Sequence, residues 1–269
     1  MSANRISPFL RWAGSKRSVL PFLSRHVPAR YERYIEPFAG SACLFFFVAP
    51  SRGVISDLNS ELIETYLTVR QHPSETARIL AEMPVSRGDY YVVRAMRSSD
   101  LNERERAARF IYLNRFCFNG LYRTNTLGKF NVPFGAPKNN SVPSERHLNA
   151  CADLLWSSDI VCGDFETVVS NVVKDGDFVY LDPPFFQTSK RVFREYTAKP
   201  FMESDLVRLR ELLQTIDGKG ATFVVSYSYC PEVEEIFRGW KTTTIETQRN
   251  ISGFAKHRRK AMELIVTNS

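Results

Sequence analysis

The sequence lacks the features that define several protein classes. No apolar run reaches the roughly 18 residues that a membrane-spanning helix needs, and the longest, at residues 42–49, is far too short. The N-terminus has neither a long apolar stretch nor a small-residue cleavage site, so we expect no secretory signal. With 43% hydrophobic and 24% charged residues in a chain of 269, wholesale disorder is excluded. We therefore expect a globular, cytoplasmic protein.

Signatures for metals and for common nucleotides are also missing. The five cysteines are odd in number, none forms a C-x-x-C pair, and the four histidines are scattered, so we expect neither a metal site nor a disulfide framework. The sequence contains no G-x-G-x-x-G and no G-x-x-x-x-G-K-[ST] motif. Their absence disfavours a nicotinamide dehydrogenase and a P-loop ATPase.

Six short runs rich in Val, Ile, Phe and Tyr are typical of strands buried in a parallel or mixed sheet. They lie at residues 33–38, 53–57, 159–164, 177–182, 221–226 and 262–267. Helical patterns follow most of them, at residues 60–71, 203–217 and 231–237. This alternation predicts an α/β sheet with crossover helices. A polar segment before the last strand predicts that the sheet ends in an antiparallel hairpin.

The alternation breaks between residues 58 and 145. The first part of this region has helical spacing, and residues 117–145 form an irregular stretch rich in Asn, Gly and Pro. We therefore predict a mostly helical subdomain, residues 58–145, inserted into a sheet domain made of residues 1–57 and 146–269.

Chemically capable residues fall at the predicted carboxyl ends of strands, where open α/β sheets bind their ligands. Asp182 follows a buried strand, and the rigid backbone of Pro183 and Pro184 offers carbonyl acceptors without N–H donors. Phe185 adds an aromatic face. A carboxylate, a fixed carbonyl and an aromatic plate suit a planar amine such as a nucleobase. The alternative is a strand-ending turn with a solvated aspartate.

A second group of motifs predicts a site for a nucleoside cofactor. Gly40 lets the backbone approach a ligand, and the helix that follows offers unpaired N–H groups. Asp57 ends the next strand, in position to bond a ribose hydroxyl. Just before the first strand, the segment FLRWAGSK at residues 9–16 supplies a Trp and a Lys.

Together these motifs resemble the Dam-like (D12 class) family of adenine-specific DNA methyltransferases over nearly the whole chain. The matching segments are FLRWAGSK at 9–16, EPFAG at 36–40, DLN at 57–59, NRFCFNGLYR at 114–123, FNVPFG at 130–135, GDF at 163–165, DPPF at 182–185 and RKAME at 259–263. The resemblance implies a Rossmann-like sheet, S-adenosyl-L-methionine as cofactor and methyl transfer to the 6-amino group of adenine in double-stranded DNA. The product would be S-adenosyl-L-homocysteine.

The resemblance also implies roles for individual residues. Lys16 would pair with the cofactor carboxylate, Asp57 would bond the ribose, and the GDF motif would lie beside the cofactor adenine. The implied catalytic residues are Asp182, Pro183, Pro184 and Phe185. The implied cofactor-binding residues are Trp12, Lys16, Glu36, Phe38, Gly40, Asp57, Asp164, Phe165 and Asp182.

These residues suit the chemistry. The 6-amino group of adenine is a poor nucleophile, because its lone pair is delocalised into the ring. Asp182 and the Pro183 carbonyl can accept its two hydrogens and aim the lone pair at the methyl group, so that positioning and electrostatics supply the rate. No Pro-Cys dipeptide occurs, so the covalent route of cytosine 5-methyltransferases is disfavoured. The adenine would have to flip out of the duplex, with Phe185 stacked on it.

The net charge of +7 favours an anionic partner. Residues 115–146 carry five Lys or Arg and one Glu, residues 186–199 carry four and one, and residues 256–260 carry four and none. Such clusters suit a phosphate-tracking surface, although any one of them alone could be a solvated loop. We expect DNA contacts at Arg115, Asn119, Arg123, Asn125, Lys129, Lys138, Asn139, Asn140, Lys190, Arg191 and Arg258.

Three positions depart from the family pattern. Ala42 stands where a second glycine is usual and is predicted to crowd the cofactor slightly. Phe185 replaces the more common Tyr but keeps the stacking face. Leu127 precedes Gly128, where the GATC-specific branch commonly has a basic residue, so we predict a recognition sequence other than GATC.

We further expect a monomer that acts on the bacterial nucleoid or in a phage-infected cell. Two alternatives to the leading interpretation stay open at this point. One is a methyltransferase acting on RNA or on another amine, and the other is a DNA-binding regulator that has lost catalysis.

Overall fold

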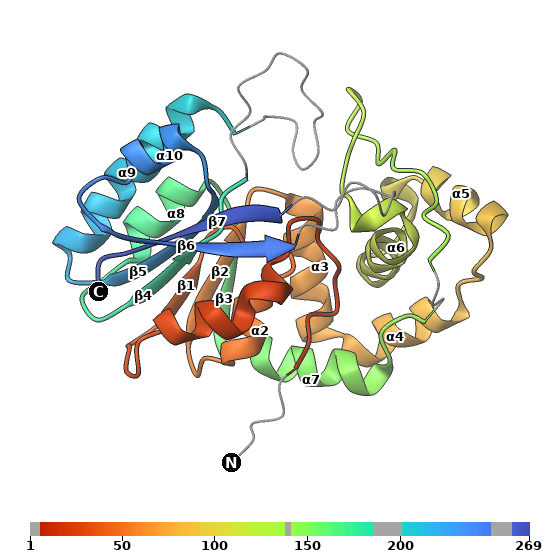
Figure 1. Cartoon of the computed structure of the whole chain (residues 1–269). Coiled ribbons are helices and arrows are strands. Elements are labelled where there is room, and N and C mark those ends of the chain that lie inside the picture. Colours follow the sequence, from red (N-terminus) through yellow and green to blue (C-terminus); the bar gives the residue numbers. More distant parts are fainter. Residues whose placement is uncertain (1–5, 138–140, 185–200, 249–259) are drawn as a thin grey trace.

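The computed structural model describes residues 6–137, 141–184, 201–248 and 260–269 (Figure 1). One seven-stranded sheet organises the chain, in the order β3-β2-β1-β4-β5-β7-β6. The strands are β1 (Tyr34–Glu36), β2 (Gly53–Asp57), β3 (Ser158–Cys162), β4 (Phe178–Leu181), β5 (Thr222–Ser228), β6 (Lys241–Gln248) and β7 (Lys260–Thr267). The first five are parallel, and β7 runs antiparallel to both β5 and β6. The predicted sheet and its closing hairpin are confirmed.

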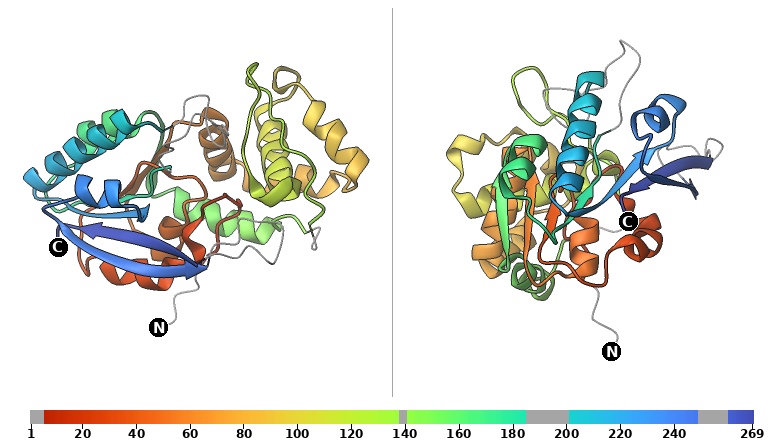
Figure 2. Two further views of the ribbon diagram at one scale, coloured as in Figure 1. Left: turned by 45° about the horizontal axis from the view of Figure 1, so that its top comes forward. Right: turned by 90° about the vertical axis from the view of Figure 1, so that its left-hand side faces the viewer.

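Helices cover both faces of this sheet, because successive residues of each strand point to opposite sides. On β1, Tyr34 packs in a cluster with the helices α2 (Cys43–Val48), α3 (Ser60–Gln71) and α7 (Glu145–Leu155), while Ile35 belongs to the opposite cluster. That second cluster includes α8 (Phe165–Val172), α9 (Glu203–Gly218) and α10 (Pro231–Ile236). The result is a three-layer α/β/α arrangement (Figure 2).

The chain reverses its direction of travel across the sheet between β1 and β4. From β1 it proceeds outward to β2 and β3, and after β3 it returns to β4 on the other side of β1. This is a topological switch point, the place where open α/β sheets form a crevice beyond the strand ends. Glu36 at the end of β1 and Asp182 directly after β4 both lie there.

The helices that directly follow α3 in the sequence lie to one side of the sheet (Figure 1). This helical region contains α4 (Pro73–Glu82), α5 (Arg87–Ala95), α6 (Glu103–Phe116) and the short 3-10 turns at Ser98–Asp100 and Phe118–Gly120. Helix α3 packs against both α6 and β3, and α7 packs against both α4 and β3, so these two helices join the helical region to the sheet (Figure 1). Asn102 starts α6 with a capping box that includes Glu105, which accounts for the position of this helix start.

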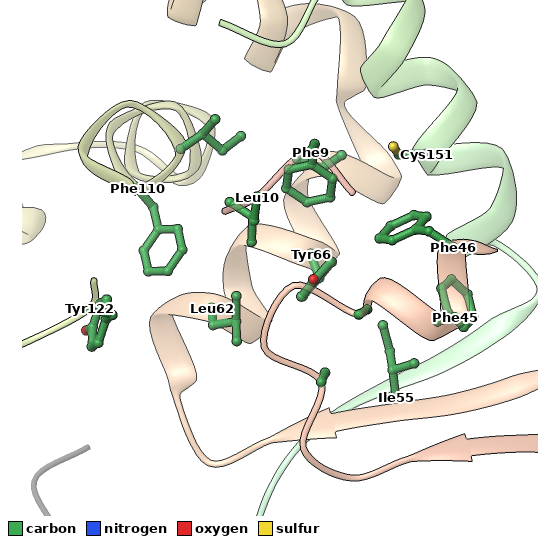
Figure 3. Packing of buried hydrophobic residues seen from close by; sticks show 14 of the residues in the cluster. Phe9, Leu10, Phe45, Phe46, Ile55, Leu62, Tyr66, Phe110, Tyr122 and Cys151 are labelled. Carbon is green, nitrogen blue, oxygen red and sulfur yellow. The ribbon is translucent and has the colours of Figure 1, made fainter. Parts of the chain in front are cut away.

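The N-terminal segment lies within the hydrophobic core. Phe9 contacts Phe46 of α2 and Tyr66 of α3 edge-on, with ring centroids 6.2 and 5.3 Å away (Figure 3). Leu10 is fully buried in the same cluster. The chain then forms a 3-10 turn at Lys16–Val19, the helix α1 (Leu20–Leu23) and a second 3-10 turn at Ser24–His26. Among the described residues, no helix has both the length and the apolar character needed to cross a bilayer.

Candidate active site

The carboxylate of Asp182 is held at the end of β4 by a buried ammonium group. Lys16 Nζ donates to Asp182 Oδ1 over 2.7 Å, and the Ser226 hydroxyl donates to the same oxygen over 3.3 Å. The ammonium also lies 3.0 Å from Glu263 Oε1 on β7. One buried lysine therefore pairs with two carboxylates that come from different strands.

The pKa values of this group reflect a balance between burial and charge. Burial raises the pKa of Asp182, and although the Lys16 ammonium opposes this effect, the pKa stays above its usual value. Burial lowers the pKa of Lys16, but the carboxylates of Asp182 and Glu263 outweigh it and hold the pKa above its ordinary value. The lysine is therefore charged at neutral pH.

Hydrogen bonds from β5 fix the backbone after Asp182. The Tyr227 hydroxyl donates to the Pro184 carbonyl over 3.2 Å. Ser226, which contacts Asp182, is itself 2.9 Å from the Tyr180 hydroxyl. The segment Asp182–Pro184 is thus a rigid strand end whose carboxylate is oriented by Ser226 of β5 and by Lys16 of the 3-10 turn Lys16–Val19. Phe185 lies outside the described residues.

Glu36, at the end of β1, is buried beside this group. Its side chain accepts a hydrogen bond from the Tyr34 hydroxyl over 2.8 Å, and the residue is only 2% exposed. Burial raises the pKa of Glu36 to about 8, with the Tyr34 bond acting in the opposite direction. At pH 7 the side chain is therefore mainly protonated, and it adds little charge to the site.

The turn after β1 joins Gly40 to the aspartate that ends β2. Gly40 N donates to Asp57 Oδ2 over 3.0 Å, and Asn59 N donates to Asp57 Oδ1 over 2.9 Å. Gly40 has a φ of +47°, and a Cβ at this position would lie 2.8 Å from Trp12 Cδ1. Only glycine therefore meets both the conformation and the space at this turn. The predicted association of Trp12, Gly40 and Asp57 in space is present.

Ala42 follows in an unusual conformation. Its φ of +48° and ψ of +45° lie in the left-handed region, and the residue is fully buried at the start of α2. A Cβ in this region costs roughly 1–2 kcal/mol, which explains why glycine would be preferred here. The effect of Ala42 on a bound cofactor stays a prediction.

A third part of the candidate site follows the end of β3. Asp164 caps α8, because its Oδ1 accepts from the backbone N–H of Glu166 over 3.1 Å. Phe165 stacks on Phe38 with a centroid distance of 5.0 Å and an interplanar angle of 29°. These contacts bring together the residues expected near the cofactor adenine.

Arg208, on α9, also contacts this part of the site, although the sequence did not point to it. Its guanidinium pairs with Asp164, with Glu166 at 2.7 Å and with Asp205 at 2.9 Å, and it lies 4.8 Å from the centre of the Phe165 ring. A single cation thus fixes both Asp164 and Phe165. Its sequence context resembles a solvated helix face, so no local pattern identifies it.

The expected DNA-contacting residues Arg123, Asn125 and Lys129 lie on one exposed hairpin-like loop. Asn131 N donates to the Arg123 carbonyl over 3.0 Å, and Asn125 N donates to the Lys129 carbonyl over 2.9 Å. The Asn125 side chain also accepts from the backbone N–H of Lys129 and so closes the turn. Leu127, at the tip of this loop, is 77% exposed. The loop extends away from α6 (Figure 1).

Arg115 lies near two arginines of the N-terminal segment. Its Nε donates to the Ser141 carbonyl over 2.8 Å, and its own carbonyl accepts from Arg11 over 3.3 Å. Burial lowers the pKa of Arg115, and the positive charges of Arg11 and Arg17 lower it further. Arg11 and Arg17 fall outside the three basic clusters of the sequence, so no local pattern marks them as DNA contacts.

The remaining expected DNA contacts divide into two groups. Asn119 is exposed beside Gly120, with a φ of +55°. Six residues lie outside the described residues, as Phe185 does: Lys138, Asn139, Asn140, Lys190, Arg191 and Arg258.

Comparison with known proteins identifies the family. A family model described as D12 class N6 adenine-specific DNA methyltransferase matches residues 12–251. The chain belongs to this family. Three relatives match almost end to end. Type II methyltransferase M1.LlaDCHI of Lactococcus lactis subsp. cremoris is 37% identical, over 100% of this chain and 98% of its own. M.MjaIII of Methanocaldococcus jannaschii is 32% identical (98% and 99%), and the DNA adenine methylase of Escherichia coli K12 is 30% identical (98% and 95%).

The methyltransferase uses S-adenosyl-L-methionine to methylate the 6-amino group of adenine in DNA, as its family membership shows. The residues at the switch point fit this cofactor. An acidic residue ends β2, a glycine turn follows β1, and an aromatic pair lines the end of β3. Within the described ranges, no group of three or more His, Cys, Asp or Glu side chains is placed to hold a metal ion.

Proposed function

We propose that the methyltransferase flips its target adenine out of the duplex and transfers the methyl group directly to the amine. Asp182 and the Pro183 carbonyl would accept the two hydrogens of the 6-amino group. The observation that carries this proposal is the buried contact of Lys16 with Asp182, because it fixes a carboxylate at the switch point beside the cofactor residues. Base flipping is required since the amine is inaccessible within a stacked duplex.

The cofactor residues are proposed to act as the family resemblance implies, with one change of emphasis. Asp57 would bond the ribose hydroxyls, while Asp164 and Phe165 would contact the adenine ring. The remaining surface of the cofactor site would be lined by Glu36, Phe38, Gly40 and Trp12. Lys16 contacts Asp182 and Glu263 directly, which supports a role in holding the catalytic carboxylate rather than the cofactor carboxylate.

The helical region, residues 58–145, is proposed to recognise the DNA sequence. Its exposed loop would present Arg123 to base edges, because Arg can bond guanine bidentately. The Asn125 side chain accepts from the backbone N–H groups of Leu127 and Lys129 and would hold the loop in the conformation that presents Arg123. Lys129 and the group around Arg115 would contact phosphates and fix the register. We propose that the enzyme acts as a monomer on double-stranded DNA in the cytoplasm.

The proposed flipping is tested with a fluorescent base. Methylation mapping first identifies the recognition sequence, and a duplex is then made with 2-aminopurine in place of the target adenine. Because 2-aminopurine is quenched when stacked, binding of the wild-type enzyme with S-adenosylhomocysteine should raise its fluorescence several-fold. A duplex with 2-aminopurine two base pairs away is the control. Specific binding without a rise at the target position would contradict the proposal.

A further inference from the structure

Among the described residues, the buried cluster around Lys16 joins one ammonium to two carboxylates. The Lys16 ammonium is within 3.0 Å of carboxylate oxygens of both Asp182 and Glu263. The side chains of Lys16 and Glu263 are 8% and 6% exposed, so water screens these charges weakly. With both carboxylates ionised, one ammonium leaves a formal charge of −1.

Glu263 occupies an unusual place for an acidic residue. It sits inside β7, opposite Ser228 of β5 and Ile245 of β6, and it is followed by the buried apolar residues Leu264 and Ile265. Burying a carboxylate in a strand interior is costly unless the charge is compensated. Departures from local rules of this kind are expected at functional sites.

We propose that Glu263 is a positioning residue whose surplus negative charge makes the site favour the cationic methyl donor over its neutral product. The inference rests on the proposed direct transfer, because an amine held by Asp182 requires the sulfonium centre to lie close to this cluster. S-adenosylmethionine carries a sulfonium charge that S-adenosylhomocysteine lacks. A fixed negative charge nearby therefore acts on one ligand and not on the other.

Glu263 also affects Asp182 through the shared lysine. Because the Lys16 ammonium lies near both carboxylates, Asp182 is neutralised less than it would be in an isolated pair. Asp182 thus keeps more of its capacity to accept the hydrogens of the amine. Removing the charge of Glu263 should lower both the preference for the donor and the rate of transfer.

The test measures dissociation constants for both ligands by calorimetry, with the full-length enzyme and no DNA. We expect Glu263→Gln to lower the ratio of the S-adenosylhomocysteine constant to the S-adenosylmethionine constant by roughly fivefold to tenfold, mainly through weaker binding of the donor. Glu263→Asp, which keeps the charge, should retain most of the ratio. Glu246→Gln removes an exposed charge from the neighbouring strand β6 and should leave the ratio unchanged.

A folded Glu263→Gln enzyme with the wild-type ratio would overturn the inference, even if both ligands bound more weakly. If this variant does not fold, Glu263→Met tests the same loss of charge, because an apolar side chain of similar length suits the interior of β7, and the ratio should again fall. A wild-type ratio in a folded Glu263→Met enzyme would overturn the inference. Failure of the wild-type enzyme to bind either ligand would overturn the cofactor site as well, which distinguishes the two results.

Discussion

Two aspartates end parallel strands of the same sheet, yet their surroundings differ. Asp57, the last residue of β2, accepts hydrogen bonds from the backbone N–H groups of Gly40 and Asn59, which are neutral. Asp182, after β4, contacts the Lys16 ammonium. Burial raises the pKa of both carboxyls, and it is opposed by backbone hydrogen bonds at Asp57 and by a full charge at Asp182. Residue type and strand position are therefore the same, while the electrostatic setting differs.

Under the proposed function, this difference assigns cofactor binding to Asp57 and catalysis to Asp182. A carboxylate held by neutral donors retains lone pairs for neutral ribose hydroxyls and undergoes no change of partner during the reaction. A carboxylate held by an ammonium and a hydroxyl is oriented towards a group that becomes positive as the methyl group is transferred. Electrostatic preorganisation of this second kind lowers a barrier, whereas uniform binding mainly affects substrate affinity.

The largest expected effect comes from Asp182→Ala. Loss of one preorganised electrostatic contact typically lowers turnover by about 100- to 1,000-fold, and we expect at least this loss in methyl transfer from labelled S-adenosylmethionine to duplex DNA. Saturating cofactor should not restore the rate. Asp175→Ala, on the exposed turn before β4, is the matched control. Near-wild-type turnover by a folded Asp182→Ala enzyme would rule out the proposed mechanism.

Glu36 lies on β1, between the strands of the two aspartates, and the charges of both contribute to raising its pKa. The folded protein holds this proton up to about pH 8, whereas the ordinary value is 4.5. The contribution of Glu36 to stability is therefore complete below pH 4.5 and is lost as the pH rises towards 8. Relative to Glu36→Gln, the wild-type free energy of unfolding should fall by up to about 1.4 kcal/mol per pH unit in this window.

Urea denaturation of both proteins at pH 5, 6.5 and 8 measures this difference. If the difference in the free energy of unfolding between the two proteins is the same at all three pH values, Glu36 is ionised in the folded state. Glu36 would then carry a negative charge between Asp57 and Asp182, and this charge would couple the two aspartates electrostatically.

Asp57→Ala should affect affinity rather than turnover. We expect the dissociation constant for S-adenosylmethionine to rise by about tenfold to a hundredfold, since loss of a hydrogen bond to a charged group costs about 1.5–3 kcal/mol. Excess cofactor should recover most of the turnover, in contrast to Asp182→Ala. Asp57→Asn keeps one acceptor oxygen for the Gly40 turn and should show a smaller rise. An unchanged constant in Asp57→Ala, measured by calorimetry, would mean that the ribose binds elsewhere.

The sequence was sufficient to locate both aspartates, because a buried strand followed by an acidic residue or by glycine is a local pattern. The sequence also predicted the alternation of strands and helices along the chain and the closing antiparallel hairpin, which is formed by β6 and β7. Glu263 ends the matching segment RKAME, but no role was predicted for it, because its contact with Lys16 depends on the pairing of β7 with β5. Arg208 was missed for the same physical reason, since Asp164 and Glu166 lie at the start of α8, distant in the sequence, and Asp205 lies in its own charged helix.

The smallest expected effect concerns Leu127, far from both aspartates. In the proposed complex, its exposed position at the tip of the loop would place it against a base or a phosphate, and a leucine cannot donate a hydrogen bond there. We expect methylation mapping of DNA from expressing cells to find modified adenines outside GATC. Leu127→Arg should increase the share within GATC by about fivefold, because a bidentate contact at this exposed loop tip should fall at the low end of the range of about 1–3 kcal/mol. Thr126→Ser, at the adjacent loop position, should leave the distribution unchanged. If the wild-type enzyme modifies adenines only within GATC, the loop reads this sequence through residues other than 127, and the prediction is wrong.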